Sequence, residues 1–156
     1  MWDRLSWGNA INGFLIGVAV TFVFPLPSVE YYGRPRPFRV VRLVLQFMWS
    51  LAVASVHVAK MALRRSPPPR GSIIEVHLRT RSDLYLTLVA VMTVLVPGSV
   101  VVDVRRSAGI LYVHDVDAVD AETLEERRAA VLDLERRLVL AIGTQEEIAL
   151  VEGNAT

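Results

Sequence analysis

The chain has 156 residues, of which 53% are hydrophobic and 21% charged, and its formal net charge is +1. Its mean hydropathy of +0.40 is above that of an average soluble domain, so length and composition favour a small water-facing domain joined to a membrane anchor. The absence of cysteine excludes a disulfide framework, a thiolate metal site and a cysteine nucleophile.

Charge is unevenly distributed along the chain. From Arg34 to Arg81 there are ten lysines and arginines and one acid, Glu75, whereas from Asp115 to the end there are eleven acids and four arginines. This division predicts a basic collar at a membrane surface, followed by an acidic, solvated region. The basic stretch 64–81 has few aromatic residues, which favours lipid headgroups over nucleic acid as its partner.

Residues 5–26 carry no charge and predict a first transmembrane helix, since about 20 apolar residues span a bilayer core. A signal peptide fits less well, because Pro25-Leu26-Pro27 is not a small-residue cleavage site. Residues at a spacing of four predict a face for close helix packing, although glycine is in any case common in membrane helices. The predicted packing residues are Asn9, Gly13, Gly17 and Thr21.

Residues 40–63 predict a second span, with the uncharged run Leu43–Ala59 bracketed by Arg42 and Lys60. Polar residues lie close to one face of this helix, and they are Gln46, Ser50, His57 and Lys60. Two interpretations stay open. In the first, His57 and Lys60 form a proton or cation relay. In the second, His57 makes a hydrogen bond between helices, and Lys60 reaches the membrane surface.

The predicted transmembrane region therefore covers residues 1–66, and a basic, proline-rich linker at 67–71 leads out of it. The charge of this linker favours the cytoplasmic side. The loop before the second span is also rich in arginine, so charge alone does not define the orientation. Beyond the linker, Ser72–Arg79 alternates apolar and polar residues and predicts a strand.

Asp83 to Pro97 is apolar but has only thirteen uncharged residues before the proline, fewer than the ~17 that a span requires. We therefore expect a buried helix that crosses a sheet, with its outer face against a partner or the membrane helices. Ser99–Arg105 and Ile110–Val116, joined by the turn 106–109, predict a β-hairpin. An open two-stranded ribbon cannot lie in lipid, so this hairpin belongs to a water-facing domain.

Asp120 is the predicted N-cap of a helix over Ala121–Ile142, and Gly143 is its predicted stop. Leu124, Val131, Leu134, Leu138 and Ile142 form its apolar stripe. Residues 144–156 are expected to be a loose tail.

The fold class predicted from these elements is a membrane protein of the α+β class. Two N-terminal transmembrane helices precede a small cytoplasmic domain at 72–143 with the order β-α-β-β-α, which is similar to most of a ferredoxin-like unit.

Motifs for nucleotide binding, phosphate binding, metalloprotease and serine-hydrolase chemistry are absent from the sequence. His114 lies among Asp115, Asp117 and Asp120, but their spacing is not that of a calcium loop, and we interpret these acids as strand-end residues that cap the next helix. Asp103 and His114 lie on paired strands, but no motif places a nucleophile beside them, so we interpret a hydrogen bond between them as structural. The sequence predicts no enzyme, no cofactor and no metal site.

Two segments carry a resemblance to a known family. They are PGSVVVDV, residues 97–104, and LYVHDVD, residues 111–117. Following a pair of membrane helices, they resemble the MnhE family, which provides the E subunit of the Mrp-type multisubunit Na⁺/H⁺ antiporter. Val96 and Ser99 depart from the family pattern, which has threonine at both positions. The residues that match its motifs are Pro97, Gly98, Asp103, Tyr112 and His114.

The resemblance implies an accessory, non-catalytic subunit of a plasma-membrane complex that exchanges Na⁺ or Li⁺ for H⁺. Its expected partners are the other subunits and membrane lipid, without nucleic acid and without a small-molecule substrate of its own. Two alternatives stay open, namely a proton- or cation-conducting element that uses His57 and Lys60, and a free-standing membrane-anchored sensor domain.

Overall fold

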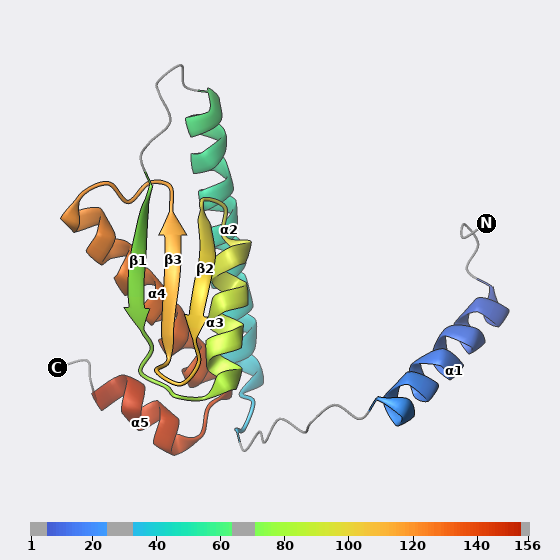
Figure 1. The fold of residues 1–156 in the computed structure, drawn as a ribbon. Helices are drawn as coiled ribbons and strands as arrows, with labels where there is room; N and C mark the ends of the chain where they lie inside the picture. The colour runs from blue at the N-terminus through green and yellow to red at the C-terminus, as the bar shows by residue number, and fades with distance from the viewer. Residues whose placement is uncertain (1–5, 25–32, 64–70, 154–156) are drawn as a thin grey trace. The chain divides into compact units, whose positions relative to one another are not determined.

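The computed structural model describes residues 6–24, 33–63 and 71–153, and it divides into two units, residues 1–31 and 32–156 (Figure 1). The described residues of the first unit, 6–24, form one helix, α1 (Trp7–Val23). Ser6 caps this helix by accepting a hydrogen bond from the Asn9 backbone N–H, at 3.3 Å. The helix predicted in this region is therefore present. Its 17 residues, about 26 Å at 1.5 Å per residue, are at the lower limit for a span.

The second unit begins with α2 (Pro37–Leu63), a helix of 27 residues that starts three residues before the predicted span at 40–63. Proline suits the first helical position, because the N–H that it lacks would have no partner within the helix. Within the described residues, α2 is the one helix long and apolar enough to cross a membrane, by length and composition alone.

The remaining elements form a small α/β domain, residues 71–153. They are β1 (Ser72–His77), α3 (Asp83–Leu95), β2 (Ser99–Arg105), β3 (Ile110–Asp115), α4 (Ala121–Ile142) and α5 (Gln145–Gly153). The sheet has the strand order β1-β3-β2, and β3 is antiparallel to both of its neighbours. β1 and β2 are therefore parallel to each other, and α3 makes the crossover between them. The chain is an α+β protein with a three-stranded antiparallel sheet, as predicted.

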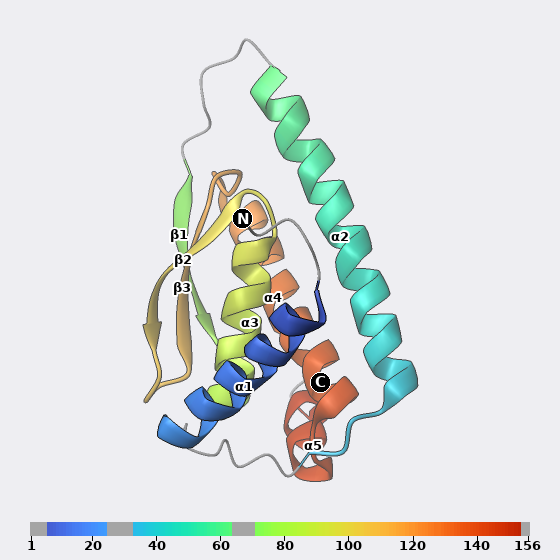
Figure 2. The same ribbon diagram turned by 90° about the vertical axis from the view of Figure 1, so that its right-hand side faces the viewer.

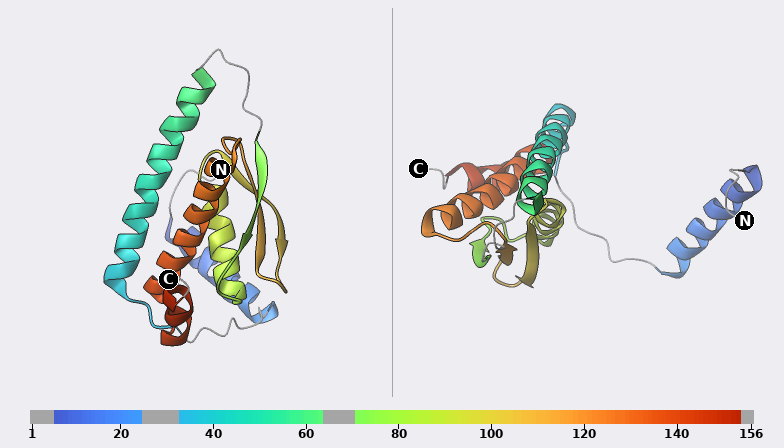
Figure 3. Two further views of the ribbon diagram at one scale, coloured as in Figure 1. Left: turned by 90° about the vertical axis from the view of Figure 1, so that its left-hand side faces the viewer. Right: turned by 90° about the horizontal axis from the view of Figure 1, so that it is seen from above.

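Helices cover one face of the sheet, with α3 against β2 and α4 against β1 (Figures 1 and 2). α2 packs on α4, on the side of the helical layer that faces away from the sheet (Figure 3). The second unit thus has three layers. The sheet is one outer layer, α3 and α4 form the middle layer, and α2 is the other outer layer.

The core lies between the sheet and α3 and α4. Alternate residues of the strands point into it, among them Ile74, Val76, Leu111 and Val113, as the predicted alternation requires. α3 contributes Tyr85, Leu86, Val89 and Thr93. The apolar segment is thus a helix with one side buried against the sheet, as predicted. Its outer side remains exposed at Val91, Val94 and Leu95.

The turn of the hairpin is the predicted one, and Gly109 in it has a φ of +66° that suits glycine. Arg106 in this turn pairs with Asp83 at the start of α3. The hydrogen bond from Arg106 lowers the pKa of the Asp83 carboxyl, and the same pair raises the pKa of the guanidinium.

α4 begins as predicted. The Asp120 carboxylate accepts from the Thr123 backbone N–H at 2.8 Å, and the Thr123 hydroxyl accepts in return from the Asp120 N–H at 3.3 Å. The bond from the Thr123 N–H, and then the bond from its hydroxyl, hold the pKa of Asp120 below its ordinary value of 3.8.

Asp120→Ala is expected to lower the melting temperature of the protein at neutral pH. A depressed carboxyl pKa stabilises the fold above the unfolded pKa of 3.8, and this contribution is lost as pH falls through the lower folded pKa. The difference between the variant and the parent protein should therefore shrink on acidification. This difference in melting temperature is measured by thermal unfolding at several pH values, monitored by circular dichroism. Glu126→Ala, at an exposed site on the same helix, is the control.

The prediction of a loose tail after Gly143 is wrong for residues 145–153, which form α5. Ile148 and Val151 of this helix are buried against the domain. Glu147 holds the helix start by accepting from the Thr144 N–H at 2.8 Å and from the Tyr85 hydroxyl at 3.0 Å. Two apolar residues three apart are too weak a pattern to predict a helix that only its docking surface stabilises.

Candidate functional site: the contact between α2 and the α/β domain

The N-terminal end of α2 is held on the C-terminal end of α4. The Arg36 backbone N–H donates to the Ala141 carbonyl at 2.9 Å, and its guanidinium donates to the Leu140 carbonyl at 3.1 Å. Arg39 donates to the same Leu140 carbonyl at 3.2 Å. The last carbonyls of a helix lack partners within the helix and carry partial negative charge, so arginine is well suited to bind them.

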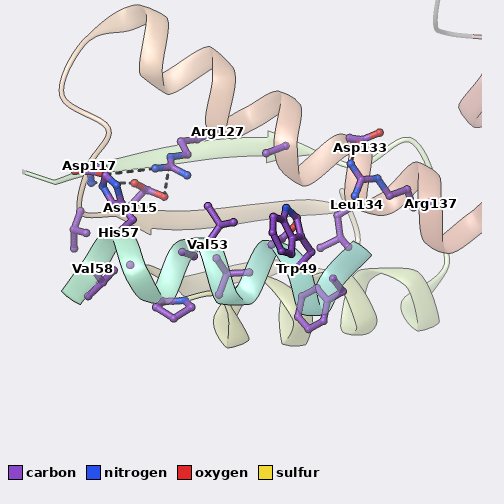
Figure 4. A pocket seen from close by; sticks show the side chains of 18 of the residues that line it. Trp49, Val53, His57, Val58, Asp115, Asp117, Arg127, Asp133, Leu134 and Arg137 are labelled. Carbon is purple, nitrogen blue, oxygen red and sulfur yellow. Dashed lines mark hydrogen bonds and ion pairs between the residues drawn. The ribbon is translucent and has the colours of Figure 1, made fainter. Parts of the chain in front are cut away.

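The other end of α2 meets the loop between β3 and α4. His57 of α2 pairs with Asp117, whose carboxylate also lies 3.6 Å from Arg127 of α4 (Figure 4). Arg127 lies 3.4 Å from Asp115 as well, and Asp115 accepts from the Asp117 N–H at 3.0 Å. We call His57, Asp115, Asp117 and Arg127 the polar cluster. Because α2 meets the end of α4 at Arg36 and its start near His57, the two helices run antiparallel.

A cavity of about 540 Å³ lies between these two attachment points. Its α2 side is mainly apolar, with Phe47, Trp49 and Val53 (Figure 4). Its α4 side is charged, and there Asp133 pairs with Arg137. The carboxylates that line the cavity are paired within the chain, Asp115 and Asp117 with Arg127, and Asp133 with Arg137. In the described ranges, no group of three or more His, Cys, Asp or Glu residues could hold a metal.

The polar face predicted for α2 divides between two environments. The Ser50 hydroxyl donates to the Gln46 carbonyl at 3.0 Å, a bond within the helix. Ser50 and His57 line the cavity, whereas Lys60 is exposed in the last turn of α2. The partner of His57 is thus a carboxylate of the α/β domain, which neither interpretation from the sequence anticipated.

The packing face predicted for α1 can be described only within its own unit. The Thr21 hydroxyl donates to the Gly17 carbonyl at 2.8 Å, and Asn9 follows the cap at Ser6. A Cβ built on Gly13 or Gly17 would have no atom within 4 Å in this unit. Both glycines therefore leave open space along the helix, and whether another helix packs there stays a prediction.

Comparison with known proteins identifies the family. The sequence model of a family described as Na⁺/H⁺ ion antiporter subunit (MNHE) matches residues 1–141. The chain belongs to the MNHE family of Na⁺/H⁺ antiporter subunits. Its relatives include the E subunit of a Na⁺/H⁺ antiporter from Bacillus subtilis, 27% identical over 75% of this chain and 74% of the relative. Another is the E1 subunit of a Na⁺/H⁺ antiporter from Staphylococcus haemolyticus, 23% identical over 92% of this chain and 91% of the relative.

A solved structure also resembles part of the chain. It is that of the Mrp complex from Dietzia, and one of its chains is 22% identical, with a TM-score of 0.49 over 68% of this chain and 97% of that one. The family membership itself rests on the match of sequence over residues 1–141.

The residues that carry the resemblance in the sequence lie in two places. Pro97 and Gly98 form the turn before β2, where Gly98 has a φ of +97° and accepts from the Val116 N–H at 3.0 Å. Asp103, Tyr112 and His114 lie on the outer face of the sheet, opposite α3 and α4. Tyr112 pairs with Asp103 in register, and His114 pairs with Val100.

Asp103 and His114 are not opposite each other in the register of β2 and β3. Asp103 instead accepts from the Val104 N–H at 2.8 Å, beside an irregularity in the pairing of β2 with β3. The Arg105 guanidinium lies 5.4 Å from the Tyr112 ring centroid. A one-residue bulge shifts the register between these strands, and the alternation of the sequence does not reveal it.

The interpretation of Asp115 and Asp117 as helix caps is also wrong, because only Asp120 caps α4. The other two bind Arg127, which lies two turns into that helix. Glu135 is a buried residue that no motif in the sequence predicts. This carboxylate is fully buried and accepts three hydrogen bonds from Arg79 and Thr80. Its position within the apolar stripe of α4 is the one sequence feature that could have revealed it.

Proposed function

We propose that this protein acts as an accessory subunit of a multisubunit Na⁺/H⁺ antiporter and contributes to assembly and activity by binding the other subunits. The observation that carries the proposal is the family match over residues 1–141. Relatives over most of the chain are named as antiporter subunits. The family is one of transporter subunits rather than enzymes.

Two features of the chain support a binding role. Large apolar side chains are exposed on the outer sides of α2 and α3, so the protein has more apolar surface than it buries by itself. His57, the titratable group predicted for a relay, is paired with Asp117 of the same chain. A contact between His57 and a carboxylate of the same chain is a structural use of the histidine.

The membrane arrangement is part of this proposal. We expect α1 to cross the plasma membrane and the α/β domain to lie in the cytoplasm, next to the basic segment that includes residues 67–71. The multi-pass prediction depends on α2, which is long enough to cross but is held on the α/β domain at both ends. We further propose that the domain is a ferredoxin-like variant, since β1-β3-β2 is the order that three strands of that unit adopt.

His57→Ala is expected to leave cation/proton exchange per assembled complex unchanged. The half-exposed ion pair with Asp117 contributes roughly 0–1 kcal/mol to the contact of α2 with the domain. Exchange is measured in vesicles that contain the whole complex, and assembly is measured by co-purification of the other subunits. Lys60→Met, at an exposed position, is the matched variant.

Loss of exchange in an intact His57→Ala complex would contradict the accessory role and support conduction through α2. Purification of the protein from its native membrane as a single, monodisperse chain would instead favour the sensor alternative. Co-purification also tests the face of α1 that we propose for packing, because Gly17→Leu would fill the open space there.

A further inference from the structure

Three strips run along α2. The first faces the α/β domain and contains the buried Leu43 with the half-buried Val40, Leu51, Ala54 and Val58. The second is apolar and exposed on the opposite side of the helix. Its residues are Phe38, Val41, Leu45, Met48, Ala52 and Val56. The third strip is polar and lies between the other two. It contains Arg39, Arg42, Gln46, Ser50, His57 and Lys60, all at helical spacing.

The attachment of α2 to α4 extends over most of the length of the helix. From Arg36 to His57 the distance is about 32 Å at 1.5 Å per residue, which is close to the ~30 Å thickness of a hydrocarbon core. If α2 crossed the bilayer in this arrangement, the part of α4 beside it would lie in hydrocarbon too.

That part of the domain is unsuited to hydrocarbon. α4 exposes Glu125 and Glu126 and carries the half-exposed Arg136 and Arg137. The sheet behind it has open edges, whose backbone groups have no partners in lipid. Charged side chains are likewise disfavoured in hydrocarbon, even though Glu125, Arg136 and Arg137 each have an ion-pair partner on α4. Crossing by α2 and its observed packing on the domain therefore exclude each other.

We propose that α2 does not cross the bilayer but lies flat on an anionic phospholipid surface, with its exposed apolar strip inserted at the boundary of headgroups and acyl chains. An interfacial helix typically combines an apolar face with basic residues beside it. The second strip supplies the apolar face, and the basic residues beside it are Arg42 and Lys60, because Arg39 and His57 of the third strip bind the α/β domain. Arg42 and Lys60, both exposed, lie near the two ends of the polar strip, where they complement anionic headgroups. The exposed aromatic ring of Phe38 suits the same depth.

This arrangement places the membrane on one outer layer of the second unit and the polar outer face of the sheet on the opposite layer. That sheet face, with Glu75, His77, Asp103 and His114, then points away from the lipid. The inference depends on the packing of α2 and on the membrane family, and not on the accessory role, because it concerns topology rather than exchange.

Thiol labelling tests the topology, since the chain has no cysteine and each introduced cysteine is unique. Arg42→Cys and Lys60→Cys mark the two ends of α2, and Glu146→Cys on α5 marks the side of the domain. In cells and in inverted vesicles that contain the full complex, a membrane-impermeant maleimide should label all three from the same side. Labelling of Arg42→Cys and Lys60→Cys from opposite sides would overturn the proposal.

Spin labels test the depth and identify what covers the apolar strip. The complex is reconstituted in phosphatidylglycerol and phosphatidylcholine bilayers with a spin label at one of three introduced cysteines, Leu45→Cys, Ala52→Cys or Val56→Cys. A label at Glu126→Cys is the aqueous control. We expect the three labels to collide readily with dissolved oxygen and to lie at one shallow depth. A maximum depth at Ala52 would indicate a crossing helix, and loss of oxygen collisions at all three would indicate a protein partner. Either result would overturn the proposal.

Discussion

Glu135→Ala is expected to destabilise the α/β domain by about 3 kcal/mol, because it removes the acceptor for three donors at once. The carboxylate accepts from the Arg79 N–H at 3.1 Å, from the Thr80 N–H at 2.8 Å and from the Thr80 hydroxyl at 2.7 Å. Glu135 and Thr80 are both buried, so water cannot easily replace these bonds. Each buried donor left without a partner costs roughly 1–3 kcal/mol.

The loop that follows β1 depends on this carboxylate. Thr80 lies between β1 and α3, and its bonds to Glu135 of α4 hold the crossover against the helical layer. Thermal unfolding of the full chain in detergent measures the loss. Glu135→Gln keeps one acceptor oxygen but turns an amide N–H₂ toward donors, so we expect it to fall between the parent protein and the alanine variant.

Glu126→Ala, at an exposed position on the same helix, is the matched control and should leave the melting temperature nearly unchanged. If Glu135→Ala melted at the same temperature as this control, the buried carboxylate would not be the support for the crossover that its hydrogen bonds indicate.

Gly143→Ala is expected to destabilise the junction of α4 and α5 by about 2–3 kcal/mol, because the added methyl group has no space. A Cβ at this position would lie 2.5 Å from the Val139 carbonyl oxygen, 2.9 Å from Val139 Cγ1 and 3.1 Å from the Tyr85 hydroxyl. The closest of these atoms belongs to the backbone, which cannot rotate away. The substitution must therefore shift the end of α4.

The shift should reach beyond the glycine. Arg36 binds the Gly143 and Leu140 carbonyls, and the Tyr85 hydroxyl binds Glu147 of α5. We therefore expect Gly143→Ala both to lower the melting temperature and to loosen α2 from the domain. Fluorescence of Trp49, which lines the cavity beneath α2, reports the second effect, although Trp2 and Trp7 add a constant background.

Gly153→Ala is the matched control, since a Cβ there would meet no atom within 4 Å. It should leave both the melting temperature and the Trp49 fluorescence as they are in the parent protein. Equal effects of the two substitutions would show that the close approach at Gly143 does not limit stability.

Gly143 also shows why a correct prediction can rest on the wrong cause. The sequence predicts that α4 stops there, and it does. The expected reason is the left-handed conformation that glycine adopts at helix ends. Its φ is instead −73°, which any residue can adopt, and the position requires glycine because of space. Local propensity and tertiary packing selected the same residue for different reasons.

The candidate site could likewise be predicted from the sequence only in part. His57 could be singled out, because a polar face on an apolar helix is visible from helical spacing alone. Its partner Asp117 lies 60 positions later, and Arg127 is ten positions further on. No pattern within one element encodes that pairing, since it forms only when α2 lies antiparallel to α4.

Patterns within the sequence were enough to define most elements of this protein, because alternation, helical spacing, caps and turn residues act over a few neighbouring positions. They were also enough to indicate the family, through motifs in and beside β2 and β3. The placement of α2 on the α/β domain, the buried role of Glu135 and the existence of α5 became visible only in the folded chain. The free energies of these features come from contacts between residues far apart in the chain, and hydropathy along a single helix cannot distinguish a lipid neighbour from a protein one.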